Sequence, residues 1–183
     1  EPLFDAQFNA DGTAENVGTA NLTIETKANS AVLSTKQKGS QYVANFFRDK
    51  KHNNANPDGF YIVDYSGNAD FIANLNDGYS MEVVCKVNTY EGDFWSKVMS
   101  TTTSGIHHQG AYSNETEAWA WGLYGNCTPD NWNAGFGWGS FRKNFIWGPK
   151  VTNTYEHLVM VWDAERNVFT LFVNGQYALS GAA

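Results

Sequence analysis

The residues best suited to binding chemistry lie between Trp119 and Trp147, where aromatic and amide side chains are interspersed. A sugar ring presents polarised C–H groups that stack on an aromatic ring, while its hydroxyl groups need amide or carboxylate partners. This composition predicts a carbohydrate-binding platform. The predicted ligand-binding residues are Trp132, Asp130, Asn131, Asn133, Trp138 and Trp147.

Trp132 is the strongest single candidate among them. It lies in the polar segment 128–133, for which the sequence predicts a loop, so no strand neighbours would bury its ring. For Phe136 and Trp138 core packing is favoured, because they share one face of an extended segment whose other face carries glycines. Those glycines, at 135, 137 and 139, would form a bare surface that admits either a flat ligand or a neighbouring loop.

Catalytic chemistry has little support in the sequence. Retaining glycoside hydrolysis needs two carboxyl groups ~5–5.5 Å apart. The nearest pair, Glu115 and Glu117, fits the polar entrance of a strand better. His107 and His108 are adjacent, so in an extended chain they point to opposite sides and do not ligate one metal together. With no nucleophile elbow or phosphate loop in the sequence, we expect a protein that is not an enzyme.

The charge balance argues against two classes of partner. The net charge is -7 and Lys plus Arg number only 12, too few for the cationic surface that nucleic acids or anionic membranes require. No apolar run approaches the ~20 residues of a membrane span. At 183 residues the chain suits a single domain spanning 1–183.

The two cysteines predict no disulfide scaffold and no zinc site. Cys85 lies in an apolar segment that alternates like a strand, so we expect a buried free thiol. Cys127 lies in a loop-type segment, and a bridge between the two cysteines stays open as the alternative.

The elements that must position these residues are short strands. Clusters of Gly, Asn, Asp and Ser separate them, and no window of eleven or more residues keeps a 3.6-residue apolar period. The predicted strands are 4–8, 31–35, 42–47, 60–63, 79–87, 94–100, 118–124, 134–141, 156–162 and 168–173. The sequence therefore predicts an all-β fold, a two-sheet antiparallel β-sandwich.

The clearest of these elements are the strands 156–162 and 168–173 and the turn that follows them. His157, Val159 and Val161 share one face of the first strand, and Leu158, Met160 and Trp162 share the other. Both faces are largely apolar, so we expect a central strand that is buried on both sides. Asn174 and Gly175 tolerate the two positive φ angles of a type I′ turn, which predicts a chain reversal there and the start of a third strand after it.

This segment resembles the signature hairpin of laminin G-like domains, which have the concanavalin A-like jelly-roll fold. In that family a His-containing apolar strand ends in an aromatic residue and Asp, and a turn, an apolar strand and Val-Asn-Gly follow. The matching positions are His157, Val159, Trp162, Asp163, Leu171, Phe172, Val173, Asn174 and Gly175. The resemblance implies a jelly roll with a lectin-type role.

The resemblance also implies a structural calcium ion, held by Asp and Asn residues on loops at the rim of the sandwich. Aspartates in or near turns are available for such a site, although turn propensity alone explains their positions. They are Asp11, Asp58, Asp64, Asp70, Asp77 and Asp130.

Taken together, these features predict a non-catalytic recognition module for glycans in an exported bacterial protein, whether periplasmic, secreted or on the cell surface. A ligand-free accessory domain beside a hydrolase domain, a glycosidase or phosphoesterase in the same chain, is the alternative. A glycoside hydrolase is a third reading. Family members continue beyond Val-Asn-Gly with closing strands, so we expect 1–183 to be either an atypical domain or a fragment of a longer multidomain protein.

Overall fold

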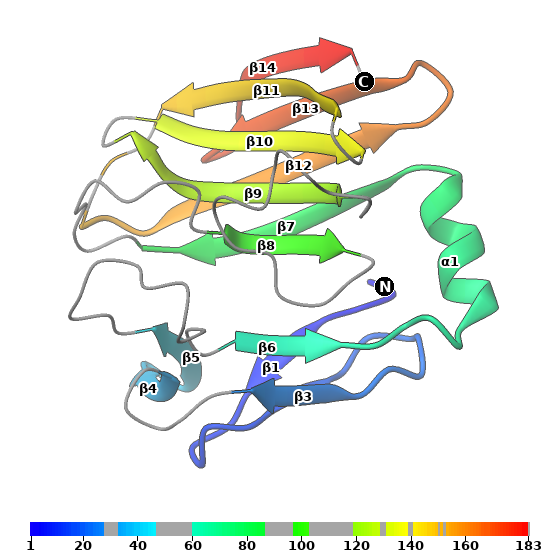
Figure 1. The fold of residues 1–183 in the computed structure, drawn as a ribbon. Coiled ribbons are helices and arrows are strands. Elements are labelled where there is room, and N and C mark those ends of the chain that lie inside the picture. Colours follow the sequence, from blue (N-terminus) through cyan, green and yellow to red (C-terminus); the bar gives the residue numbers. More distant parts are fainter. Residues whose placement is uncertain are drawn as a thin grey trace. The chain divides into compact units, whose positions relative to one another are not determined.

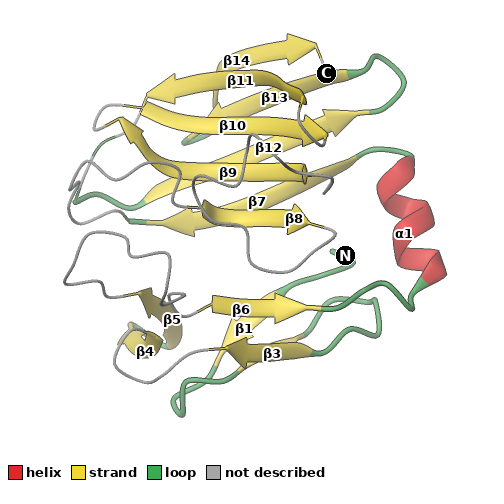
Figure 2. Ribbon diagram, in the orientation of Figure 1, coloured by secondary structure: helices red, strands yellow, loops and turns green. Residues whose placement is uncertain are grey.

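The computed structural model describes residues 1–27, 33–46, 60–86, 97–102, 119–128, 131–138, 141–149, 151 and 153–182. These residues form antiparallel strands joined by turns, and the only helix among them is α1 (Ala69–Asn76) (Figure 2). The predicted all-β class is confirmed. The chain divides into two compact units, Glu1–Leu75 and Asn76–Ala183, at a boundary where the sequence shows no linker-like composition.

The first unit contains two antiparallel sheets, one with the strand order β2-β1-β5-β4 and one that pairs β3 with β6. The rings of Phe8 and Tyr61, with centroids 5.1 Å apart, join the two sheets. The Tyr61 hydroxyl also donates a hydrogen bond of 2.9 Å to the Gly12 carbonyl. The strands are β1 (Ala6–Phe8), β2 (Ala14–Asn16), β3 (Ile24–Lys27), β4 (Leu33–Lys38), β5 (Gln41–Phe46) and β6 (Phe60–Val63).

Helix α1 begins at a side-chain cap. The Asn68 side-chain oxygen accepts a hydrogen bond of 2.9 Å from the Phe71 amide, which satisfies one amide of the first turn. The ring of Phe71 packs against Tyr65 at 5.4 Å. Eight residues are too few to show a helical apolar period over eleven positions, so the sequence pattern does not predict this helix. No helix in the described part of the chain is long and apolar enough to cross a membrane.

The second unit contains two four-stranded antiparallel sheets, ordered β14-β13-β12-β7 and β11-β10-β9-β8 (Figure 1). They meet where β11 lies against β13 and β14, a sandwich-like arrangement. The strands β8 to β11 are described by their backbone positions and pairing. The strands are β7 (Tyr79–Cys85), β8 (Lys97–Thr102), β9 (Trp119–Thr128), β10 (Asn131–Trp138), β11 (Phe141–Pro149), β12 (Glu156–Asp163), β13 (Val168–Val173) and β14 (Gln176–Ala182).

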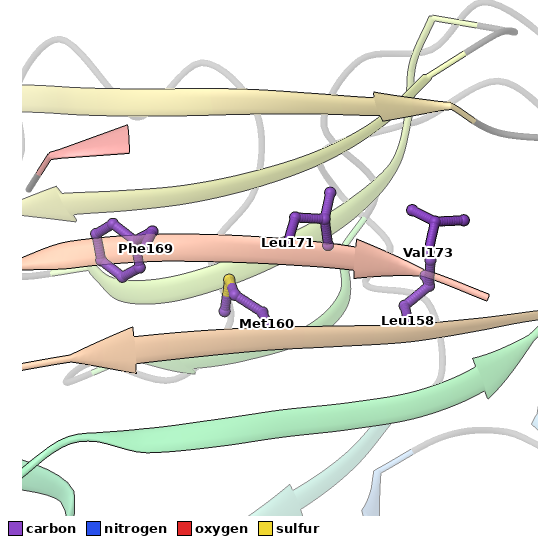
Figure 3. Close-up of a cluster of buried hydrophobic side chains, with 5 residues drawn as sticks. All are labelled: Leu158, Met160, Phe169, Leu171 and Val173. Atoms are coloured by element: carbon purple, nitrogen blue, oxygen red, sulfur yellow. The ribbon is translucent and has the colours of Figure 1, made fainter. Parts of the chain in front are cut away.

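The core of the second unit lies on one face of the β14-β13-β12-β7 sheet. Its five members come from alternate positions of β12 and β13, namely Leu158, Met160, Phe169, Leu171 and Val173 (Figure 3). Leu158 and Leu171 have no exposed surface. Half-buried residues of β7 and β14 pack against this cluster. The period of two predicted from the sequence thus sets which side chains enter the core.

Strand β12 lies between β7 and β13, which confirms the predicted central position. The expected burial on both sides is wrong for one face, where His157, Val159 and Val161 are half-buried and Glu82 of β7 lies in the open. The chain reversal after β13 is confirmed, since Asn174 has a φ of 52° and Gly175 a φ of 76°. Strands β13 and β14 pair on either side of this turn.

Strand β11 was not predicted from the sequence, whereas for β14 the start of a strand after Gly175 was predicted but not its extent. Strand β11 has Arg142, Lys143 and Asn144 near its start and ends at Pro149. These residue types have low strand propensity or interrupt alternation, so the sequence does not indicate a strand here. Strand β14 is mostly small or polar residues. Backbone pairing with a neighbouring strand holds both in place, and single-strand periodicity does not report such pairing.

Candidate ligand-binding face

The β11-β10-β9-β8 sheet contains a cross-strand row of potential ligand-binding residues. Asn133 of β10 lies opposite Tyr124 of β9 on one side and opposite Trp147 of β11 on the other. Lys97 of β8 lies opposite Tyr124. Residues directly opposite one another in a sheet share a face, so the backbone register brings two aromatic residues and an amide residue into one line.

A second row lies beside the first on the same face, two positions along each of the three strands. There Gly135 of β10 is opposite Gly122 of β9 and Phe145 of β11, and Ser100 of β8 is opposite Gly122. Two neighbouring strands therefore carry glycine at matching positions. Glycine inside a strand often marks a place where a ligand or another backbone approaches closely.

The other face of this sheet has a different composition. Along β10 it carries Trp132, Ala134, Phe136 and Trp138 at alternate positions. Ala134 lies opposite Leu123 of β9 and Ile146 of β11, which extends the apolar character across three strands. A bulge between Gly135 and Phe136 shifts the β11 register by one residue, while the alternation within β10 continues through it. The sheet is thus apolar on one face and mixed on the other.

The structure separates the predicted ligand-binding residues into two groups. Asn131, Asn133 and Trp147 belong to the mixed face, whereas Trp132 and Trp138 belong to the apolar face. Asp130 lies outside the described residues. Tyr124 was not predicted as a ligand-binding residue, although its alternation with Trp119 and Trp121 along β9 places it on the face opposite to theirs.

The expectation that Trp132 lies in a polar loop is wrong. Strand β10 begins at Asn131 and pairs with β11 along its whole length, so Trp132 lies in a strand opposite Gly148. Backbone pairing on both sides of β10 outweighs the turn propensity of the Asp and Asn residues around Trp132. Trp132 therefore does not have the loop position from which its exposure was predicted.

The described residues include several of the metal-ligand candidates and neither of the catalytic candidates. Among them, no group of three or more His, Cys, Asp or Glu residues lies close enough to hold a metal ion. Asp11 and Asp64 bond to their own turns, as predicted: Asp11 accepts from the Thr13 amide (3.0 Å) and Asp64 from the Ser66 amide (2.9 Å). Hydrogen bonds from the side chains of Thr13 and Ser66, and then those from their amides, lower the pKa of both carboxyl groups. His107, His108, Glu115, Glu117 and Asp58 lie outside the described residues.

Cys85 is a free thiol, and the alternative of a bridge to Cys127 is wrong. It is half-buried in β7, where it packs against the core cluster. Burial, and then the nearby Glu156 carboxylate, raise the pKa of the thiol to about 12. Glu156 faces Cys85 across the β12–β7 pairing and is itself only 2% exposed. Its carboxylate accepts a hydrogen bond of 2.9 Å from the Val151 amide, in the connection between β11 and β12.

No protein-family model matches the chain, and no curated protein or solved structure is significantly similar to it. Function must therefore be inferred from the strands, their register and the residues that they align.

Proposed function

We propose that the mixed face of the β11-β10-β9-β8 sheet binds carbohydrate, and that the protein is a non-catalytic recognition module. The observation that carries this proposal is the row Tyr124, Asn133 and Trp147 on three adjacent strands. Strands in a sheet are about 4.8 Å apart, so the two aromatic positions are separated by about 10 Å with the amide between them. Aromatic rings offer stacking surfaces for sugar C–H groups, and the amide offers both a donor and an acceptor.

The glycine row beside these residues supports the same proposal. Gly122 and Gly135 have no side chain, so no Cβ at these positions would keep a flat ligand from the backbone on that face. Asn131 and Asn133 lie on the same face of β10 and add hydrogen-bonding capacity along the strand. A sugar ring lying over the glycines would thus lie next to the row of Tyr124, Asn133 and Trp147.

The apolar face of the sheet supports the architecture that this proposal needs. Trp132, Phe136 and Trp138 are suited to packing against a second sheet, as in a β-sandwich of jelly-roll type. The hairpin of β12 and β13 resembles that of laminin G-like domains and supports the same architecture. The placement of the module in an exported bacterial protein rests on this resemblance alone.

A glycan array tests the proposal. Wild-type protein and the Trp147→Ala variant are applied to arrayed oligomers of glucose, galactose, mannose and N-acetylglucosamine. We expect the wild type to bind at least one class and Trp147→Ala to lose that signal, because a stacking aromatic contributes about 0.5–1.5 kcal/mol beyond its buried area. The matched control is Trp132→Phe, on the other face, which should keep the signal. A wild-type protein that binds no glycan would contradict the proposal and favour the ligand-free accessory role beside a hydrolase domain.

A further inference from the structure

Among the described strands of the second unit, β14 is an edge strand that lacks charged residues and proline. Among the described strands, β14 is hydrogen-bonded on one side only, to β13 (Figure 1). Natural edge strands are commonly protected by charged residues, proline or a covering segment. Strand β14 contains no charged residue and no proline. Two of its larger side chains are also exposed, Tyr177 at 61% and Leu179 at 38%.

The lack of charge extends over the whole β13–β14 hairpin. The chain has 12 Lys and Arg and 19 Asp and Glu, yet none of them lies after Arg166. The other edge of the same sheet, β7, carries the exposed Glu82, which pairs with His157 at 2.7 Å. Charged residues are depleted from the centres of protein interfaces, where aromatic residues are enriched. The β14 edge has this composition and the β7 edge does not.

We propose that the β14 edge pairs with the β14 edge of a second copy of the chain, which joins two four-stranded sheets into one of eight strands. A twofold axis makes the two β14 strands antiparallel, as every described strand pair in this protein is. Two copies with a net charge of -7 each repel one another, so an uncharged edge is where they meet at the lowest electrostatic cost.

The register of β14 is compatible with this self-pairing. A bulge lies between the pairs Leu171–Leu179 and Phe172–Tyr177, because Ala178 is the extra residue on β14. The four residues from Leu179 to Ala182 pair regularly with β13. Antiparallel pairing about a twofold axis at Ser180 sets Ser180 opposite its own copy and Leu179 opposite Gly181, which lies on the same face of the strand. No two large side chains then face each other.

Sedimentation velocity over a concentration series tests the proposal on the full chain. We expect a reversible dimer for the wild type. Leu179→Lys should weaken dimerisation about tenfold or more, because a lysine on an edge strand opposes strand addition. Tyr177→Lys, at a more exposed position of the same strand, should have the same effect and covers the case in which Leu179→Lys fails to fold. Val84→Lys is the matched control on β7, since Val84 is 61% exposed like Tyr177, and it should leave dimerisation unchanged.

Hydrogen exchange provides a second readout that needs no substitution. Amide exchange in β14 should slow as the wild-type concentration rises, while exchange in β7 should not change. A chain that stays monomeric at every concentration overturns the proposal. So does a dimer that survives both β14 substitutions or that is lost with Val84→Lys, because the contact then lies elsewhere.

Discussion

Asn174 is joined to His157 by two hydrogen bonds at the start of the β12–β13 pairing. The Asn174 amide donates to the His157 carbonyl (2.7 Å), and the Asn174 side-chain oxygen accepts from the His157 amide (2.9 Å). Asn174 also adopts a φ of 52° as the first residue of the turn. One residue therefore both closes the register of the central strands and allows the chain to reverse.

Replacement of Asn174 should separate these two contributions. We expect Asn174→Ala to lower the free energy of unfolding by about 2 kcal/mol, from the lost hydrogen bond and the left-handed backbone. Asn174→Gly keeps the backbone freedom and should cost about half as much. Urea unfolding measures both. Equal losses for the two variants would show that the positive φ contributes nothing.

The core cluster gives a second stability prediction. Leu158→Ala and Leu171→Ala should each cost about 2–5 kcal/mol, because both side chains are fully buried and their removal leaves a cavity. Val84→Ala, on the exposed face of β7, should change stability by less than about 0.5 kcal/mol. Thermal or urea unfolding checks this contrast. A Val84→Ala loss as large as that of Leu158→Ala would contradict the assignment of the two faces.

The reactivity of Cys85 follows from its raised pKa. With a pKa of about 12 in place of 9.0, the thiolate fraction at pH 8 falls by about a thousandfold, so an aromatic disulfide reagent should react with Cys85 far more slowly in the folded state than in the unfolded state. A Cys127→Ser background isolates the signal. The thiol pKa is about 9 in the unfolded chain and about 12 in the folded protein, so between these pH values the folded state keeps a proton that the unfolded state loses. The contribution of Cys85 to the free energy of unfolding is therefore full below about pH 9 and is lost as the pH rises towards about 12. Fast reaction in the folded state would contradict the account.

Glu156 connects this thiol to the backbone between β11 and β12. Glu156→Gln keeps an acceptor for the Val151 amide and removes the charge, so we expect the pKa of Cys85 to fall and its reaction with the reagent to speed up. Glu156→Ala also removes the acceptor and should cost about 1–3 kcal/mol of stability. Unchanged Cys85 kinetics in Glu156→Gln would show that burial alone sets the pKa.

The β12–β13 pair was predictable from the sequence because its period of two is a local signal, and the reversal after β13 was predictable because Asn174-Gly175 is a local turn signal. The strand position of Trp132 was not predictable, because β10 forms by pairing with β9 and β11. The same limit applies to the binding face. Asn133 and Trp147 were both predicted, yet only the register shows that they are opposite each other and that Tyr124 joins them.

The two faces of β10 give matched substitutions at adjacent positions. Gly135→Val adds a β-branched side chain to the mixed face and should abolish sugar binding with stability unchanged or raised. Ala134→Val adds bulk to the apolar face and should cost about 1–3 kcal/mol of stability through overpacking. Array binding and thermal unfolding of both variants provide the comparison. Retained sugar binding in a folded Gly135→Val protein would show that the ligand binds elsewhere on the protein.

Nuclear magnetic resonance during titration with an array-identified sugar tests the central claim most directly. The mixed face predicts saturable shifts of the Gly122 and Gly135 amides and of the Asn133 side-chain amide, and these shifts should be absent in Trp147→Ala. Saturable shifts confined to other strands, or none at sugar concentrations that saturate the array, would contradict carbohydrate binding by this face.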